Sequence, residues 1–246
     1  ITNRSDGWSA ITLQGPFARD VLAVNTSASL DNAGFRWLTV QQIEIAGNPM
    51  WAMRLSYAGE LGWEIHGPCE NMLCVYESLW RAGEQYGIAD YGSFAMNTMR
   101  MEKAFPGASE LTNEVTLPEA NVMRFVKLDK EDFVGKKQTQ ESADGPLPWT
   151  CAYLEIDADG DADGHGGEAV LLDGEVVGST TSVAYGHTVG RTLAFAYLKP
   201  EAATAGTELE VPILGEPRRA VVLGEAAYDP ANSLPRTDVD AARLRA

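Results

Sequence analysis

The fold of the first half of the chain depends on residues 54–68, which read RLSYAGELGWEIHGP. From Met53 to Tyr57 apolar and polar residues alternate, and this period of two predicts a half-buried strand with Tyr57 pointing inward. Gly59 and Gly62 provide the backbone freedom that a short connection between two strands needs. We therefore expect a strand, a tight loop and a second strand.

Two side chains at the inner ends of this hairpin indicate a binding site. If the chain doubles back, Tyr57 and Glu64 face each other across residues 58–63. A carboxylate can accept two parallel N–H bonds and an aromatic ring can stack on a ligand, so the pair suits a flat heterocycle with an amidine-like edge. From the pattern alone, a plain hairpin with Tyr57 in the core and Glu64 on the surface is the commoner case.

This hairpin resembles the signature hairpin of the glycine-cleavage T-protein (aminomethyltransferase) family, and later stretches resemble the same family in the same order. Residues 90–105 resemble the family helix with its LRLEK-like motif, here MRMEK. Residues 116–120 and 125–136 follow, and residues 174–197 are similar to the carboxy-terminal barrel of the family. The sequence of these motifs most resembles the tetrahydrofolate-binding half of dimethylglycine and sarcosine dehydrogenases and oxidases, and the resemblance covers roughly residues 9–225.

The resemblance implies an α+β fold, in which a partial aminomethyltransferase folate-binding domain is followed by a small antiparallel β-barrel domain. We expect the first domain at residues 1–140, a linker at 141–149, the barrel at 150–228 and a loosely held polar tail at 229–246. The linker, ESADGPLPW, contains two Pro and one Gly, and the pattern changes to short strands after it. The resemblance also implies that the N-terminal part of the family domain is absent from the chain.

The resemblance also implies that the protein binds tetrahydrofolate. By motif position Glu64 is the carboxylate that binds the pterin edge, and Tyr57 is its aromatic neighbour. The T-proteins have Ala-Arg-Asp where this chain has AMN at residues 95–97, so the folate tail needs another cation. Arg100 is the nearest candidate, and an intrahelical pair or a buried structural role is an equally good interpretation of it. The aspartate that assists the family reaction lies upstream of this segment, so the catalytic residues are unknown.

The function that the resemblance implies is one-carbon transfer in an N-methyl amine demethylating oxidoreductase of the dimethylglycine or sarcosine type, with formation of 5,10-methylenetetrahydrofolate. FAD would then lie in an upstream domain or a partner subunit, and the small-molecule partners would be folate and a methylated amine. Three alternatives stay open. They are a glycine-cleavage-type aminomethyltransferase, an S- or O-methyl demethylase, and a non-catalytic module of a larger complex, so enzymatic activity of the chain itself is uncertain.

Composition limits the partners of the chain. With 45% hydrophobic and 22% charged residues in 246, it is an ordinary globular protein. Nineteen basic against 35 acidic side chains give a net charge of −16, which argues against nucleic acid and anionic membranes as partners. No run approaches the roughly 20 apolar residues of a membrane span. Because the chain begins at Ile1, it can be an excerpt or a processed product.

Cysteine and histidine usage gives no metal site and suggests a reducing compartment. The chain has three Cys and three His, none in a metal-ligand spacing, and we expect a cytoplasmic protein without disulfides or bound metal. Residues 159–164, DGDADG, begin like an EF-hand loop, but the twelfth position is Val170 instead of Glu. A flexible acidic loop is the better interpretation.

The expected elements follow from hydrophobic periodicity. Residues 70–86 have the clearest amphipathic helical pattern, residues 17–22 form a short helix, and Asp90 can cap another helix. Strands are expected at residues 9–13, 37–45, 50–56, 150–156, 169–172, 175–177, 193–198, 209–213 and 220–223. The helix after Asp90 should bury a face made of Tyr91, Phe94, Ala95, Thr98, Met101 and Phe105.

Overall fold

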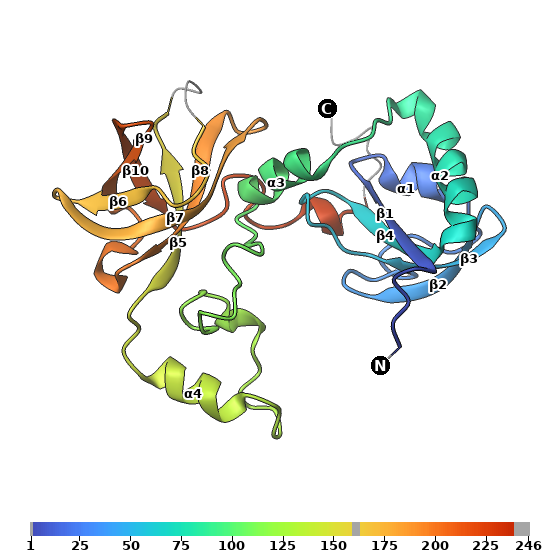
Figure 1. Cartoon of the computed structure of the whole chain (residues 1–246). Helices are drawn as coiled ribbons and strands as arrows, with labels where there is room; N and C mark the ends of the chain where they lie inside the picture. The colour runs from blue at the N-terminus through green and yellow to red at the C-terminus, as the bar shows by residue number, and fades with distance from the viewer. Residues whose placement is uncertain (1, 159–162, 239–246) are drawn as a thin grey trace. The chain divides into compact units, whose positions relative to one another are not determined.

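The computed structural model describes residues 2–158 and 163–238. The chain forms two compact units, of which unit 1 contains residues 1–96 and 229–246 and unit 2 contains residues 97–228. Unit 2 is therefore inserted, along the chain, between the two parts of unit 1. Figure 1 shows an α+β unit and a barrel unit.

Unit 1 is a four-stranded antiparallel sheet with two helices on one face (Figure 1). The strands have the order β1-β4-β3-β2, and the helices α1 and α2 pack against β1 and β4. The bounds are β1 Trp8–Gln14, α1 Ala18–Ala23, β2 Val40–Ile45, β3 Asn48–Met53, β4 Gly62–Pro68 and α2 Cys69–Gly83, followed by a 3-10 turn at Glu84–Tyr86.

The sequence explains these elements locally. In β4 the buried Trp63 and Ile65 alternate with the half-buried Glu64 and His66, which gives the sheet one apolar face toward the helices and one polar face. The tight β2–β3 turn at Ala46 and Gly47 has φ values of 51° and 76°, the left-handed region that favours a two-residue hairpin turn. On α2, the buried residues are spaced three or four apart, as on one helical face: Met72, Val75, Leu79 and Gly83.

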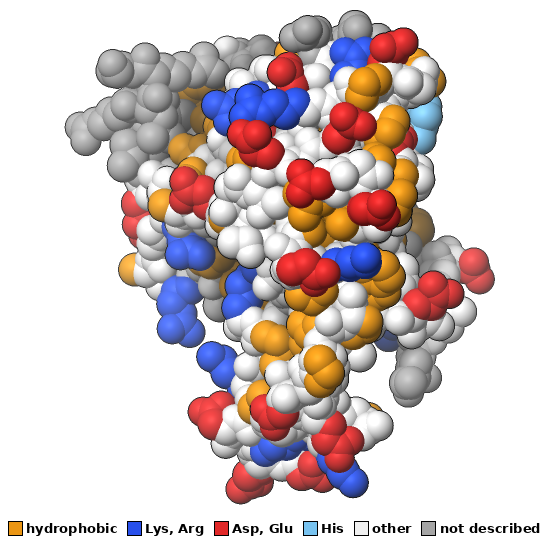
Figure 2. Space-filling model, turned by 90° about the vertical axis from the view of Figure 1, so that its left-hand side faces the viewer, with side chains coloured by type: hydrophobic (Ala, Val, Ile, Leu, Met, Phe, Trp, Pro, Cys, Tyr) orange, Lys and Arg blue, Asp and Glu red, His pale blue; other side chains and the backbone are white. Residues whose placement is uncertain are grey.

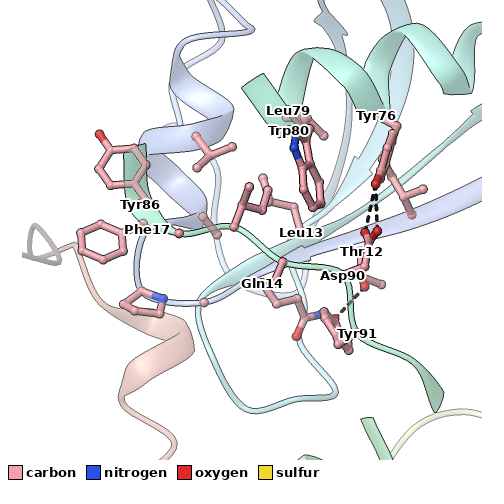
Figure 3. A pocket seen from close by; sticks show the side chains of 18 residues that line it. Thr12, Leu13, Gln14, Phe17, Tyr76, Leu79, Trp80, Tyr86, Asp90 and Tyr91 are labelled. Carbon is pink, nitrogen blue, oxygen red and sulfur yellow. Dashed lines mark hydrogen bonds between the residues drawn. The ribbon is translucent and has the colours of Figure 1, made fainter. Parts of the chain in front are cut away.

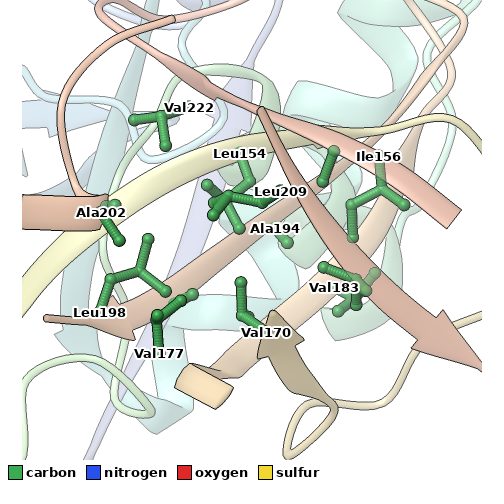
Figure 4. Packing of buried hydrophobic residues seen from close by; sticks show 14 of the residues in the cluster. Leu154, Ile156, Val170, Val177, Val183, Ala194, Leu198, Ala202, Leu209 and Val222 are labelled. Carbon is green, nitrogen blue, oxygen red and sulfur yellow. The ribbon is translucent and has the colours of Figure 1, made fainter. Parts of the chain in front are cut away.

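Unit 2 contains a closed antiparallel barrel of six strands in the order β10-β5-β8-β7-β6-β9. The strands are β5 Thr150–Ile156, β6 Ala169–Leu172, β7 Glu175–Gly186, β8 Arg191–Leu198, β9 Glu208–Ile213 and β10 Glu216–Leu223. Figure 4 shows the aliphatic core, in which Leu154, Ala194 and Val222 are among the buried residues. Closure pairs every strand on both sides, so the barrel has no exposed edge. The β-rich domain predicted for residues 150–223 is thus confirmed.

Three further helical segments precede the barrel strands. Helix α3, Ser93–Glu102, begins in unit 1 and ends in unit 2. A 3-10 turn at Met123–Phe125 and helix α4, Lys136–Asp144, follow. The burial pattern of α3 differs from the expected one, because Phe94 is 90% exposed while Arg100, Met101 and Glu102 are buried. Two further 3-10 turns lie at Pro200–Ala202 and Leu234–Arg236.

The spatial units differ from the domain boundaries expected from the sequence. Residues 97–140 belong to the compact unit of the barrel, and α4 extends to Asp144, inside the expected linker. The expected tail is packed where it is described. Pro235 is buried and its carbonyl accepts from the Arg54 guanidinium, while the Thr237 carbonyl accepts from Arg19 at 2.7 Å. Hydrogen bonds from two arginines to backbone carbonyls thus attach this polar segment to the rest of unit 1, although its sequence has no apolar pattern.

The described surface carries mixed charge. On the face shown in Figure 2, acidic side chains lie among apolar and basic ones and do not gather into one patch. No helix in the described ranges is long and apolar enough to cross a membrane. Those ranges also contain no group of three or more His, Cys, Asp or Glu side chains that could hold a metal ion. Residues 159–162 of the acidic loop lie outside the described residues.

Candidate functional site

Glu64 lies in the middle of β4, on the sheet face that α1 and α2 do not cover. In the strand register it is opposite Thr12 of β1 on one side and Met53 of β3 on the other. Its side chain is 28% exposed. A carboxylate in this position is held between two strands and is still accessible to a ligand.

His66 is a neighbour of Glu64 that the sequence interpretation did not use. It lies two residues further along β4, so its side chain points to the same sheet face. Its Nε2 is 3.3 Å from Glu64 Oε2, and both side chains are about one third exposed. The Glu-x-His spacing on a strand was the available signal. This contact can orient the carboxylate while leaving lone pairs for a ligand.

Tyr57 does not occupy the inward position that the alternation predicted. Strand β3 ends at Met53, and beyond it the buried side chains are Arg54 and Ser56, whereas Tyr57 is only half-buried. Arg54 is held inside the unit because its Nη1 donates to the Phe35 carbonyl at 2.6 Å and its Nη2 to the Pro235 carbonyl, although its Nε has no partner among the described residues. The burial of residues 54–57 thus differs from the expected alternation, and the approach of Tyr57 to Glu64 stays a prediction. Folate contact by Tyr57 stays a prediction.

A different tyrosine lies beside Glu64. The Tyr91 hydroxyl is 2.8 Å from Thr12 Oγ1, and Thr12 is the cross-strand partner of Glu64. Burial raises the pKa of Tyr91, the Thr12 hydrogen bond acts against this, and the Glu64 charge adds to the rise. The preceding residue, Asp90, accepts hydrogen bonds from the Tyr76 hydroxyl at 2.9 and 3.2 Å. These two attachments fix the segment before α3 on β1 and α2.

A cavity of about 390 Å³ lies next to this segment. Figure 3 shows it between β1, α2 and residues 86–91, with Trp80 and Tyr76 projecting from α2 and the stacked rings of Phe17 and Tyr86 at one end. Gln14 contributes a buried Nε2 that has no hydrogen-bond partner among the described residues. The cavity is thus largely apolar and aromatic, with Tyr91 at the end nearest to Glu64.

Arg100 lies in a buried hydrogen-bond network of unit 2. Its Nη1 is 3.0 Å from the Glu110 carboxylate and its Nη2 donates to Ser182 at 2.9 Å, and both charged side chains are at most 4% exposed. Burial by itself raises the pKa of Glu110, but hydrogen bonds from Ser182, Thr181 and the Gly107 N–H and the charge of Arg100 hold this pKa below its usual range. The buried structural role is the one that the structure shows for Arg100. Its binding to a folate tail stays a prediction.

The three cysteines are free thiols. Cys69 and Cys74 are exposed, whereas Cys151 is buried in unit 2. Burial raises the pKa of the Cys151 thiol to about 12, and the charge of Glu110 contributes to this rise. Cys151 is therefore protonated at neutral pH and has no nucleophilic character there.

The fold and the site define a class: a two-unit α+β protein with a closed antiparallel barrel and an accessible carboxylate on the open face of its sheet. Residues 1–130 match the GCVT N-terminal domain, and residues 150–229 match the glycine cleavage T-protein C-terminal barrel domain. The chain belongs to the glycine cleavage T-protein family.

Individual relatives agree with this assignment. The chain is 36% identical over 227 residues to mitochondrial dimethylglycine dehydrogenase of Homo sapiens, covering 92% of the chain and 26% of that protein. It is 30% identical over 229 residues to the aminomethyltransferase of Caldanaerobacter subterraneus subsp. tengcongensis, covering 93% of the chain and 60% of that protein. The crystal structure of glycine cleavage system aminomethyltransferase T from Bartonella henselae shares the fold, with a TM-score of 0.79 at 21% identity over 91% of this chain and 60% of that one.

The chain thus spans about a quarter of the dimethylglycine dehydrogenase and 60% of the aminomethyltransferase. The boundary between the two family domains also differs from the spatial division, since residues 97–130 match the N-terminal family domain and fold with the barrel.

Proposed function

We propose that this chain is the folate-binding part of an enzyme that transfers a one-carbon unit to tetrahydrofolate. The observation that carries the proposal is the position of Glu64, on the open face of the sheet and only 28% exposed. The pterin ring carries a ring N–H and an amino group side by side, and a carboxylate can accept from both. The Glu64 carboxylate suits this edge as an acceptor, because only its Oε2 contacts His66 and lone pairs remain for the two pterin donors.

In this function the chain binds and orients folate. Glu64 fixes the pterin edge, and the fixed ring determines where N5 meets the incoming carbon, which is the contribution of orientation to the rate. The folate supplies the nitrogen atoms that accept the one-carbon unit and close it to 5,10-methylenetetrahydrofolate. No residue of this chain is assigned to a proton-transfer step.

We further propose that the carbon comes from an N-methyl amine of the dimethylglycine or sarcosine type. Support comes from the 36% identity to a protein named dimethylglycine dehydrogenase. An FAD domain or subunit, which would accept the two electrons from the N-methyl group, belongs to this proposal. A location in the cytoplasm is also proposed, and the three free thiols favour a reducing compartment.

A glycine-cleavage-type aminomethyltransferase is the second candidate, since the chain is 30% identical to a protein of that name. The two candidates differ in their donor. Purified full-length protein is incubated with dimethylglycine or sarcosine. Formation of methylenetetrahydrofolate with reduction of bound flavin indicates the N-methyl amine demethylating activity. Turnover only with an aminomethyl group delivered by another protein indicates the second.

Folate binding is tested by calorimetric titration of the full-length protein with tetrahydrofolate. Glu64→Gln replaces one acceptor oxygen by a donor and removes the charge, and loss of a charge-assisted hydrogen bond costs roughly 1.5–3 kcal/mol, about 10- to 150-fold in affinity. Glu64→Ala should weaken binding at least as much. The matched control is Glu44→Gln, an exposed Glu on β2 of the same sheet, which should bind like wild type. Equal affinities for wild type and both Glu64 variants would remove the folate assignment.

A further inference from the structure

The strand register brings the side chains of Thr12 and Glu64 close together. The Cys69 N–H donates to the Gly7 carbonyl and the Gly15 N–H donates to the Leu61 carbonyl, so the odd-numbered residues of β1 form the hydrogen-bonded pairs with β4. Thr12 and Glu64 are therefore a non-hydrogen-bonded pair, in which Cα atoms are about 4.5 Å apart and side chains stand close on one face. Whatever is bound to the Thr12 hydroxyl lies beside the Glu64 carboxylate.

Tyr91 occupies that place. Its hydroxyl is 2.8 Å from Thr12 Oγ1, and the adjoining Asp90 is bound to the Tyr76 hydroxyl on α2 (Figure 3). Because the hydroxyl is attached to Thr12 at one end of the side chain and the backbone holds the other end, the long axis of the ring is fixed in position. The residue is nevertheless 38% exposed, which leaves surface for a ligand.

We infer that Tyr91 is the aromatic residue that positions the pterin ring held by Glu64. The inference rests on the proposed function, since it presupposes that Glu64 binds the pterin edge. Tyr91 is an aromatic residue beside Glu64 in addition to the Tyr57 expected from the sequence pattern, because Tyr91 is bound to the cross-strand neighbour of Glu64. It is a positioning residue and takes no part in proton transfer.

The chemistry of the site agrees with this role. A phenol that stays protonated at neutral pH adds no second negative charge beside Glu64 and presents a neutral ring face. Offset or edge-on packing of such a ring on a flat heterocycle restrains its tilt, while the carboxylate restrains its in-plane rotation. Together the two contacts determine the direction in which N5 points.

The experiment compares tetrahydrofolate affinities of full-length wild type with four variants. Tyr91→Leu removes the ring and should weaken binding about 2- to 12-fold, the range typical of one aromatic pair. Tyr91→Phe keeps the ring and should stay within about 2-fold of wild type. Thr12→Val removes the same hydrogen bond from the other side and keeps the ring, so it should also stay within about 2-fold of wild type. The matched control, Tyr86→Leu, removes a ring at the opposite end of the cavity and should bind like wild type.

The outcomes separate the inference from the proposed function. If Glu64→Gln weakens binding and Tyr91→Leu does not, Tyr91 has no positioning role and the folate assignment stands. If Tyr91→Phe and Tyr91→Leu lose affinity equally, the hydroxyl and not the ring is responsible, and the inference fails. Equal losses for Tyr91→Leu and Tyr86→Leu indicate a general packing defect and also overturn it. If Glu64→Gln binds like wild type, the proposed function and the inference fail together.

Discussion

The buried pair of Arg100 and Glu110 should make a large contribution to the stability of unit 2. The change to test is Glu110→Gln, which removes the charge and keeps the size. It leaves the Arg100 guanidinium buried without a counter-charge, since both side chains are at most 4% exposed. Breaking a buried pair from one side costs about 3–5 kcal/mol.

This loss of free energy can be converted into a decrease in melting temperature. For a chain of 246 residues, 1 kcal/mol corresponds to roughly 2–4 °C, so we expect the melting temperature to fall by about 6–20 °C. The matched control is Glu155→Gln, which breaks a pair of similar length in the same barrel, 3.0 Å between Glu155 and Arg191, with side chains 30% and 51% exposed. An exposed pair contributes about 0–1 kcal/mol, so the control should lose less than about 4 °C.

The assay is thermal unfolding followed by near-ultraviolet circular dichroism, repeated at several pH values. The folded-state pKa of Glu110 lies below its unfolded value, so the stabilisation is complete above the unfolded pKa and is lost as the pH falls through the folded pKa. The difference in melting temperature between wild type and Glu110→Gln should therefore become smaller in strong acid. If this difference at neutral pH is no larger than the difference for Glu155→Gln, the reasoning is refuted.

Three further outcomes are expected. Gly178→Ala should destabilise the barrel by about 1–3 kcal/mol in urea unfolding, because a Cβ there would lie 2.1 Å from the Tyr197 carbonyl oxygen, and an unchanged midpoint would contradict the close approach. A thiol reagent at neutral pH should label the two exposed cysteines of the native protein, and Cys151 only after unfolding. Truncation after Tyr228 should remove the Pro235 carbonyl, one of the two carbonyl partners of Arg54, and increase hydrogen exchange in unit 1 while leaving the barrel protected.

Much of the fold could be predicted because it is encoded in local patterns. The period of two along β1, β3 and β4, the helical period of α2 and the short strands after residue 149 all appear in the structure close to where the sequence places them. Burial on one face of an element is a local property, and a regular alternation of apolar residues is enough to specify it.

The candidate site was harder to predict because it depends on contacts between residues distant in the sequence. Arg54 takes an inward position since the Phe35 carbonyl, 19 residues away, accepts from it, and this reverses the expected orientation of the residues up to Tyr57. Tyr91 reaches Thr12 across 79 residues. Neither contact leaves a periodic signal in the sequence.

The insertion of unit 2 within unit 1 has a consequence for synthesis on the ribosome. The barrel unit is covalently complete once Tyr228 has left the exit tunnel, because it is made of residues 97–228. The sheet of unit 1 is made first, but the Pro235 carbonyl that accepts from the buried Arg54 is made after the whole barrel. In a nascent chain, the Arg54 guanidinium therefore has its Phe35 acceptor early but lacks the Pro235 acceptor until the final segment has emerged.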